Sequence, residues 1–483
     1  MTNPSSPSKF KWLSLVVLSL ALAIIVIDGT VLNVAQKYVI DDLKTDLSTI
    51  QWAFTGYSLV LAALTIFGGR LGDLFGRKKM FVLGAIIFAL GSTITAFAQN
   101  STMLLIGWSV IEGIGAALMV PASSALLVSN FEGKERGIAF GVYGATAGAA
   151  SSFGPILGGF FASNIGWRWA FGINVFIAII LCLGSLIVLD KKENYPEKTY
   201  LDYIGVLLSA TGLTAIVYGI IEAGKNGLFH PTSLSILGGL GLLTAFVIYE
   251  LNLEKQGKDP LISISIFKNR SFTFGVLTLA SLFSGFSGLI TYGVVSFFLV
   301  VRGLSAFETG LALIPFSITT LVLAPLSAKM ADKIGQKTLV ILGLLINSIG
   351  VFLIYNALNI SATTQDFIIP FAVTGIGFGM IAAQLNNIIL SSVKVAQAGV
   401  ASGINGTIRE VARALGIAII GAGFISMTTN YTGLNRLVGI TDASKVALLY
   451  TLGANIIAIA LAFGIKNKIK EPGMKLKDNG IKL

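Results

Sequence analysis

Charged residues are scarce in this chain of 483 residues, and that scarcity excludes an ordinary soluble protein. Only 12% of the residues are Asp, Glu, Lys or Arg, whereas soluble domains carry about 25%. Hydrophobic residues make up 54% of the chain, and the mean hydropathy is +0.83. A net charge of +11 would suggest a nucleic-acid partner in a soluble protein, but basic loops beside a membrane explain it better here. The composition therefore predicts a polytopic membrane protein that does not bind nucleic acid.

Cysteine and histidine occur once each, which excludes a disulfide framework and a metal site built from these residue types. Cys182 lies in an apolar run, where it is interpreted as a small packing residue. His230 precedes Pro231 in a short polar loop, where it is interpreted as a solvated side chain. The sequence also offers no cluster of a nucleophile with a base. We therefore expect no enzyme activity, no metal ion and no cofactor.

Apolar stretches of about 20 residues, long enough for a helix to cross a bilayer, occur fourteen times in the sequence. Lys9 and Lys11 precede the first stretch, which continues through Asp28 without a cleavage site of small residues, so we expect a retained helix and not a signal peptide. The stretches lie near residues 12–36, 50–72, 80–99, 103–129, 137–162, 169–189, 203–223, 232–251, 271–300, 309–331, 338–358, 367–392, 399–426 and 446–465.

Lys and Arg are distributed unevenly over the predicted loops. With the N-terminus in the cytoplasm, the external side carries 7 of the 34 basic residues and the cytoplasmic side carries the rest. Cytoplasmic loops of membrane proteins carry such an excess, so a multi-pass protein of the cell membrane with both termini in the cytoplasm is predicted. The basic tail over 466–483 is then a cytoplasmic flank beside anionic lipid.

Two distant parts of the chain repeat one another. The glycine-rich stretch GIAFGVYGATAGAASSFGPILGG at 137–159 corresponds to GVASGINGTIREVARALG at 399–416, with an offset of 262 residues. The loop GRLGDLFGRKK at 69–79 corresponds to LSAKMADKIGQK at 326–337, with an offset of 259 residues. Small residues at helical spacing let helices approach closely in a membrane. The repeats therefore predict two related halves.

The offset between the repeats is too long for six helices with their loops. It fits two further helices inserted between two six-helix halves. We therefore expect an all-α polytopic membrane protein with 14 transmembrane helices. The predicted segments are an N-terminal six-helix half at 1–189, two additional helices within 190–265, a C-terminal six-helix half at 266–465 and the cytoplasmic tail at 466–483.

Five short motifs point to a known family. They are IDGTVLNVAQ at 27–36, QWAFTGYSL at 51–59, GGRLGDLFGRKK at 68–79, GAASSFGPILGG at 148–159 and GWRWAFGINV at 166–175. In this order and spacing they resemble the major facilitator superfamily, specifically its 14-spanner drug:proton antiporter branch. The resemblance covers essentially the whole chain, and it implies the major facilitator fold and transport by alternating access.

The fourth helix departs from the branch pattern. The branch normally offers an Arg three residues before a Gln-Gly pair, whereas this sequence reads SVIEGIGAAL at 109–118. Ser109 therefore stands where the Arg should be, and Glu112 replaces the Gln. The Arg that the resemblance would assign to a proton relay on the fourth helix is therefore absent from this sequence.

Ionisable residues inside apolar stretches are functional hypotheses, because a charge at the bilayer centre costs at least ~2.5–3.5 kcal/mol. Asp28, with Asn33 nearby, is predicted to couple proton transfer to transport, and the alternative is a structural carboxylate hydrogen-bonded to Asn33 or a neighbouring helix. Glu112 is predicted as a second proton carrier or a structural residue. Arg409 and Arg413 lie one turn apart on the thirteenth helix. They are predicted to act either as counter-ions for Glu112 or as substrate contacts.

The loop after the second helix is predicted to latch a cytoplasmic gate. The basic residues alone could only set the topology, but a carboxylate there can accept from a helix N-terminus or pair with an Arg. The resemblance implies this latch role for Asp73, and Asp332 is its counterpart in the second half. The predicted gate residues are Asp73, Gly76, Arg77, Lys78 and Asp332.

The fifth helix carries the motif that resembles one associated with antiporters, comprising Gly154, Pro155, Gly158 and Gly159. A proline inside a helix removes a backbone hydrogen bond and can kink the helix. The functional interpretation is a flexure that limits leak. The alternative is static packing of the small faces against the eighth helix or its equivalent.

The sequence thus predicts a proton-coupled antiporter that exports amphipathic, preferentially cationic drugs or toxic compounds. An anionic metabolite or a lipid-like substrate on the same scaffold is the alternative, because Arg409 and Arg413 would suit it. A non-transporting membrane receptor is a weaker alternative, since no large soluble region is present. The expected partners are a small amphipathic substrate, protons and membrane lipid, and the expected state is a monomer.

Overall fold

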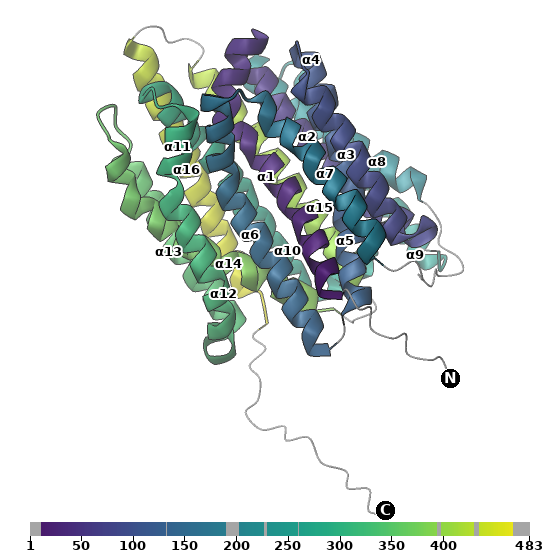
Figure 1. The fold of residues 1–483 in the computed structure, drawn as a ribbon. Coiled ribbons are helices and arrows are strands. Elements are labelled where there is room, and N and C mark those ends of the chain that lie inside the picture. The colour runs from purple at the N-terminus through teal and green to yellow at the C-terminus, as the bar shows by residue number, and fades with distance from the viewer. Residues whose placement is uncertain are drawn as a thin grey trace, which may run out of the picture.

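The computed structural model describes residues 11–131, 133–189, 202–226, 229–258, 260–393, 398–428 and 434–466. Helices run up and down through a single bundle (Figure 1). The first helix, α1 (Lys11–Leu43), begins at the same end of the bundle at which the last, α16 (Leu434–Phe463), ends. We call this the basal end and the opposite one the distal end.

The apolar stretches form the helices that the sequence predicts. Before residue 190 these are α2 (Leu47–Phe75), α3 (Arg77–Ala96), α4 (Ser101–Leu104) with the π-helical segment Leu105–Glu112 and α5 (Gly113–Asn130), α6 (Gly133–Asn164) and α7 (Arg168–Val188). Then follow α8 (Tyr203–Asn226) and α9 (Ser235–Lys255). The remainder comprises α10 (Arg270–Gly288), continued by π-helical segments Leu289–Val295 and Phe297–Val301, α11 (Ala306–Ala312), α12 (Ile314–Ile334), α13 (Gln336–Ala357), α14 (Ile368–Ser391) and α15 (Ala398–Thr428).

The all-α prediction is confirmed. Thirteen helices are long and apolar enough to cross a membrane among the described residues, and none of those residues forms a strand. The helix α6, which is not among these thirteen, covers the remaining predicted stretch, the fifth in the chain, at 137–162. In lipid this architecture satisfies the backbone polar groups within each helix.

The helices before α8 and those after α9 pack in the same pattern. α1 packs on α6 and α7, as α10 packs on α15 and α16. α3 packs on α5 and α7, as α13 packs on α14 and α16. The two basal turns also match, because Gly76 has φ 106° between α2 and α3, and Gly335 has φ 90° between α12 and α13. The sequence repeat is therefore a repeat of structure.

Two lines of helix contact join the repeats. Along one line α2 packs on α15, and along the other α6 packs on α11 and α12. The helix α8 lies over the first line, since it contacts both α2 and α15, while α9 packs on α8. A small apolar cluster marks this place, with Leu59 of α2, Val217 and Ile221 of α8, and Ala414 and Ala418 of α15.

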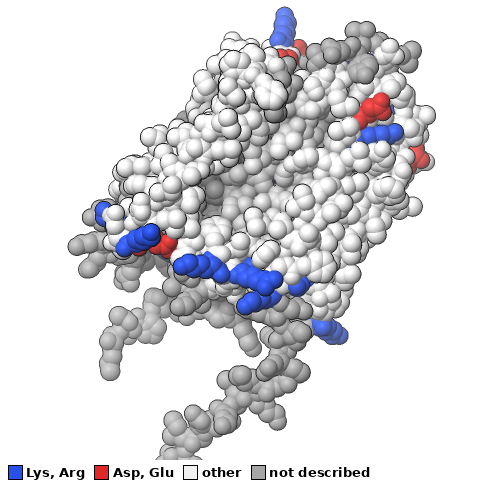
Figure 2. Space-filling view, turned by 180° about the vertical axis from the view of Figure 1, so that it is seen from behind, with Lys and Arg blue, Asp and Glu red and all other residues white. Residues whose placement is uncertain are grey.

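Basic side chains gather at the basal end. Figure 2 shows Lys and Arg along the lower edge of the molecule, the edge at which α1 begins and α16 ends in Figure 1. Lys11 Nζ pairs with Glu135 at 2.7 Å between the basal ends of α1 and α6. Lys337 Nζ donates to the Phe463 carbonyl oxygen at 2.7 Å between α13 and α16. Long basic side chains therefore link the basal ends of neighbouring helices.

Candidate functional site

Asp28 lies in the middle of α1 and is only 1% exposed. Trp108 Nε1 donates a hydrogen bond to Asp28 Oδ2 at 2.8 Å, and Asn174 Nδ2 donates one to Oδ1 at 2.9 Å. Asn174 Nδ2 also donates to Ser92 Oγ at 3.2 Å. A buried carboxylate requires donors of this kind. Two neighbouring helices, the fourth helix and α7, thus hold Asp28 as a hydrogen-bond acceptor.

Glu112 ends the π-helical segment, is fully buried, and places its carboxyl group beside Asp28, Ser92 and Thr95. Neither of its carboxyl oxygens has a hydrogen-bond partner of ordinary geometry among the described residues. Two carboxyl groups side by side in an apolar interior cannot both carry a charge without strong repulsion. The structure therefore brings two predicted site residues together as one acidic pair.

Aromatic rings cover this acidic pair. Trp108 is fully buried and stacks on Tyr57, with ring centroids 5.2 Å apart and an interplanar angle of 12°. Phe54 and Phe171 pack edge-on against Trp108 at 5.5 and 6.1 Å. The rings exclude water from Asp28, which strengthens each hydrogen bond to it.

The π-helical segment also carries Ser109. A π-helical turn inside a membrane helix is rare and often marks a functional site. Ser109 Oγ donates to the Ala53 carbonyl oxygen at 2.8 Å, and a side-chain carbon at Gly56 would lie 3.2 Å from Ser109 Cβ. The fourth helix is thus packed closely on α2 at the position where the branch pattern has Arg, and a small side chain fits there.

Arg409 and Arg413 share one carboxylate on α15. Arg409 Nε donates to Glu410 Oε1 at 3.2 Å, and Arg413 Nη1 donates to Glu410 Oε2 at 3.1 Å. Arg413 Nη2 also reaches the Gly29 carbonyl oxygen of α1 at 3.3 Å, one residue beyond Asp28. Both arginines pair with Glu410, and among the described residues neither pairs with Glu112. The cluster therefore joins α15 to the middle of α1.

Asn33 lies farther along α1, toward the distal end, and contacts the other repeat. Its Oδ1 accepts a hydrogen bond from Thr291 Oγ1 at 2.9 Å. Nearby, Gln51 Nε2 donates to the Ala418 carbonyl oxygen at 3.1 Å, and Ser163 Oγ accepts from Phe307 N at 3.1 Å. These bonds hold the two repeats together at the distal end, so Asn33 is not a partner of Asp28.

The antiporter-like motif lies on the same distal contact. A methyl group on Gly154 or Gly158 would overlap with α1, at Thr30 and Val31 respectively. A methyl group on Gly159 would overlap with the Ala306 carbonyl of α11. The small residues therefore pack on α1 and, across the second helix line, on α11.

The basal turn after α2 carries part of the predicted gate. Gly76 ends α2 in a conformation that side chains rarely adopt. Arg77 Nη1 donates to the Ala125 carbonyl oxygen at 3.3 Å, and Lys78 Nζ donates to the Leu189 carbonyl oxygen at 2.6 Å. This turn is therefore tied to α5 and to the end of α7. The side chains of Asp73 and Asp332 lie outside the described part of the structure.

The family model of the major facilitator superfamily matches residues 18–417. The chain belongs to the major facilitator superfamily. The predicted family is therefore confirmed, and the chain is a multi-pass membrane protein.

Two curated relatives support this membership, and one solved structure shares the fold. The chain is 32% identical over 429 residues to a probable actinorhodin transporter of Streptomyces coelicolor, covering 87% of this chain and 74% of that protein. It is 29% identical to the multidrug transporter protein MdtP of Bacillus subtilis, covering 84% and 74%. An auto-inhibited peptide transporter of the POT family shares the fold, with a TM-score of 0.67 at 15% identity over 94% of this chain and 96% of that one.

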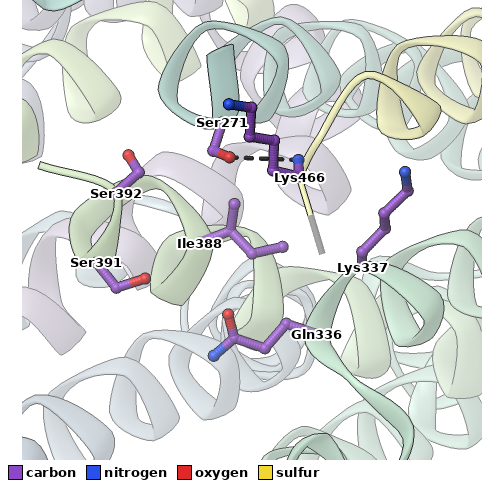
Figure 3. A pocket seen from close by; sticks show the side chains of 7 residues that line it. All are labelled: Ser271, Gln336, Lys337, Ile388, Ser391, Ser392 and Lys466. Carbon is purple, nitrogen blue, oxygen red and sulfur yellow. Dashed lines mark hydrogen bonds between the residues drawn. The ribbon is translucent and has the colours of Figure 1, made fainter. Parts of the chain in front are cut away.

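A small polar pocket lies elsewhere in the superfamily fold, between the basal ends of α10, α13 and α14 (Figure 3). The backbone N of Lys466 donates to Ser271 Oγ at 3.3 Å on its rim. Lys337 lies on the side of α13. None of the predicted site residues lines this pocket, so it is separate from the acidic pair.

Sequence reasoning missed the two donors to Asp28. Asn174 belongs to GWRWAFGINV at 166–175, so a polar side chain inside an apolar motif was a visible signal for it. Trp108 carries no comparable signal in the sequence, because a tryptophan in an apolar stretch is normally interpreted as a packing residue. Its role depends on the approach of α1 to the fourth helix, which only the structure reveals.

Proposed function

We propose that this protein is a proton-coupled antiporter that exports amphipathic small molecules, such as drugs or toxic compounds, across the cell membrane. The relatives named as a probable actinorhodin transporter and as a multidrug transporter support transport of such compounds. The loop GGRLGDLFG lacks the Gly-Lys-Ser/Thr of a phosphate-binding loop, so the proton gradient supplies the energy. The protein acts as a monomeric carrier with no cofactor and catalyses no covalent step.

The observation that carries the proposed coupling is the acidic pair of Asp28 and Glu112. Trp108 and Asn174 direct N–H donors at Asp28, and an N–H donor favours the ionised form of its acceptor. Glu112 receives no such donor, so it holds the proton of the pair. Release of that proton leaves two adjacent charges, which favours a rearrangement of the helices around them.

Arg413 links the acidic pair to the second repeat, because it contacts both α1 and α15. Its guanidinium meets the backbone of α1 at Gly29, next to Asp28, while Glu410 holds it on α15. A shift of α15 against α1 moves this positive charge relative to Asp28. Proton loss and helix movement are coupled in this way, because a nearby cation stabilises the ionised pair.

The proposed transport cycle uses the two repeats as moving units. Residues 1–189 and 266–465 rock about the acidic pair and alternately open the basal and distal ends. In this arrangement the distal end is held shut by Asn33 and Gly159. The basic side chains at the basal end support a cytoplasmic location for that end and for both termini (Figure 2). The predicted gate residues Asp73, Gly76, Arg77, Lys78 and Asp332 then govern basal opening.

Two classes of substrate are compatible with the site: a cationic compound, and an anionic or lipid-like compound. A cationic compound, as the sequence predicts, would compete with the proton for the acidic pair of Asp28 and Glu112. The alternative, an anionic metabolite or a lipid-like compound, gains support from exposure: the side chains of Arg409 and Arg413 are 29% and 22% exposed, while Asp28 and Glu112 are sealed behind aromatic rings. Arg409 also lies over the Phe283 ring at 5.9 Å, beside which a planar compound could stack.

Proton release from the purified protein on addition of compound tests the proposal. A panel of cationic, neutral and anionic amphipathic compounds is added in weak buffer, and the pH change is recorded. Removal of both carboxyl groups, by Asp28→Asn together with Glu112→Gln, is expected to abolish release, while binding, followed by tryptophan fluorescence, persists. Asp41→Asn, at an exposed position on α1, is the matched control. Normal proton release from the doubly substituted protein would refute coupling through the acidic pair.

A further inference from the structure

A second pair of buried carboxyl groups lies at the basal end of the two inserted helices, away from Asp28. Asp202 precedes α8 and is 8% exposed, and Glu250 lies near the end of α9 and is fully buried. Gly205 marks the point at which they meet. A methyl group on Gly205 would overlap with both Asp202 Oδ2 and Glu250 Oε1. The two oxygens therefore converge on one place, which stays open only because glycine occupies position 205.

One oxygen of each carboxyl group is already occupied. Asp202 Oδ1 accepts from Gly205 N at 2.8 Å and so caps the start of α8. Glu250 Oε2 accepts from Ile262 N at 3.0 Å, in the segment that leads to α10. The other two oxygens, Asp202 Oδ2 and Glu250 Oε1, have no hydrogen-bond partner among the described residues. They are buried, face each other and lack a donor.

No cation compensates this pair within the part of the chain that the structure describes, because no salt bridge there includes Asp202 or Glu250. Other polar and charged groups lie nearby. Tyr249 lies beside Asp202, and its hydroxyl makes no hydrogen bond of ordinary geometry to Asp202 Oδ2. Glu254, one turn along α9, accepts from Ser263 Oγ at 2.8 Å and lies near Lys268. Arg70, at the basal end of α2, donates to the Pro260 carbonyl oxygen at 2.8 Å.

We propose that Asp202 and Glu250 share one proton and form a proton-binding site that holds α8, α9 and the segment 260–264 together. Two adjacent carboxylates in a buried place repel one another. One proton turns one carboxyl into a donor and leaves the other an acceptor, so both free oxygens gain a partner. The site is separate from the acidic pair of Asp28 and Glu112.

The shared proton has a consequence for the basal end. The segment 260–264 is held on one side by Glu250 and on the other by Arg70 of α2, and it leads through the 3₁₀ helix Ile264–Lys268 into α10. Loss of the proton separates the two carboxylates and frees Glu250 from its position under Ile262. The contact between α2, the inserted helices and the start of the second repeat therefore loosens at alkaline pH.

Infrared spectroscopy of the full-length protein in lipid nanodiscs tests the proton directly. The difference between the wild-type and Glu250→Gln spectra at neutral pH is expected to contain the C=O band of a protonated carboxylic acid. Glu222→Gln, on α8 at the distal end, is the matched control. This protein is expected to keep the band, so the difference between the wild-type and Glu222→Gln spectra is expected to lack it. A difference spectrum with carboxylate bands alone would show that the pair holds no proton and would overturn the proposal.

Hydrogen exchange at the Ile262 amide tests the mechanical role. A glutamine at position 250 can donate to Asp202 and accept from Ile262 at every pH, so Glu250→Gln is expected to keep the amide protected. At alkaline pH the wild-type amide is expected to exchange at least about tenfold faster than in Glu250→Gln, as for loss of one hydrogen bond to a charged group. Comparison at equal pH cancels base catalysis. A ratio independent of pH, or protection that follows the sodium concentration, would overturn the proposal.

Discussion

The close contact of Gly159 with α11 leads to a quantitative prediction for Gly159→Ala. The added methyl group would overlap with the Ala306 carbonyl, which belongs to backbone and cannot turn away as a side chain could. Overpacking of this kind costs about 1–3 kcal/mol. The cost falls on the arrangement in which the distal end is closed, so the equilibrium shifts toward the open one by about fivefold to more than a hundredfold.

Labelling of a single introduced cysteine measures this shift. Cys182 is replaced by serine, and Gln36→Cys places a thiol at the distal contact, where residue 36 is 4% exposed. The rate of reaction with a polar thiol reagent in detergent reports how often the distal end opens. Gly159→Ala is expected to raise that rate by the factor above, and Gly453→Ala, where an added methyl group meets nothing within 4 Å, is expected to leave it unchanged. Equal rates for both variants would refute the reasoning.

Two further predictions concern the turns. Gly76→Ala forces a side chain into φ 106° and is expected to lower stability by about 1–2 kcal/mol, measured as a lower melting temperature than in Gly453→Ala; an unchanged melting temperature would contradict it. The hydrogen bond from the Ser305 N–H lowers the pKa of Glu308 below its ordinary value. The ionised Glu308 side chain therefore stabilises the folded protein fully above its ordinary pKa, and this stabilisation is lost as the pH falls through the lowered pKa of the folded state. Glu308→Gln is expected to remove this acid-dependent loss in thermal unfolding, and an unaltered pH profile would count against it.

Local features of the site could be predicted from the sequence. Glu410 and Arg413 are three residues apart on one helix, so their pairing follows from helix geometry alone and is present at 3.1 Å. The basal turns at Gly76 and Gly335 follow from the repeated motif. Periodicity and repetition suffice for such features because they depend on neighbours in the chain or on a second copy of the same unit.

Contacts between distant helices could not be predicted in this way. Asp28 was identified as a buried carboxylate, but its donors lie 80 and 146 residues away in the chain. The contact of Asp28 with Glu112 depends on the approach of α1 to the fourth helix, which a hydropathy pattern does not encode. Glu112 was expected to face Arg409 or Arg413, and the structure places Glu410 with both instead.

The position of α8 has a consequence for any movement between the repeats. This helix contacts α2 on one side and α15 on the other, so when the two repeats rotate apart it can travel with only one of them. The small apolar cluster contains Leu59 of α2 as well as Ala414 and Ala418 of α15, so α8 is packed against both repeats. Rotation of the repeats must therefore separate α8 from one of its two neighbours or slide it along that neighbour, and the inserted helices limit how far the repeats can move apart.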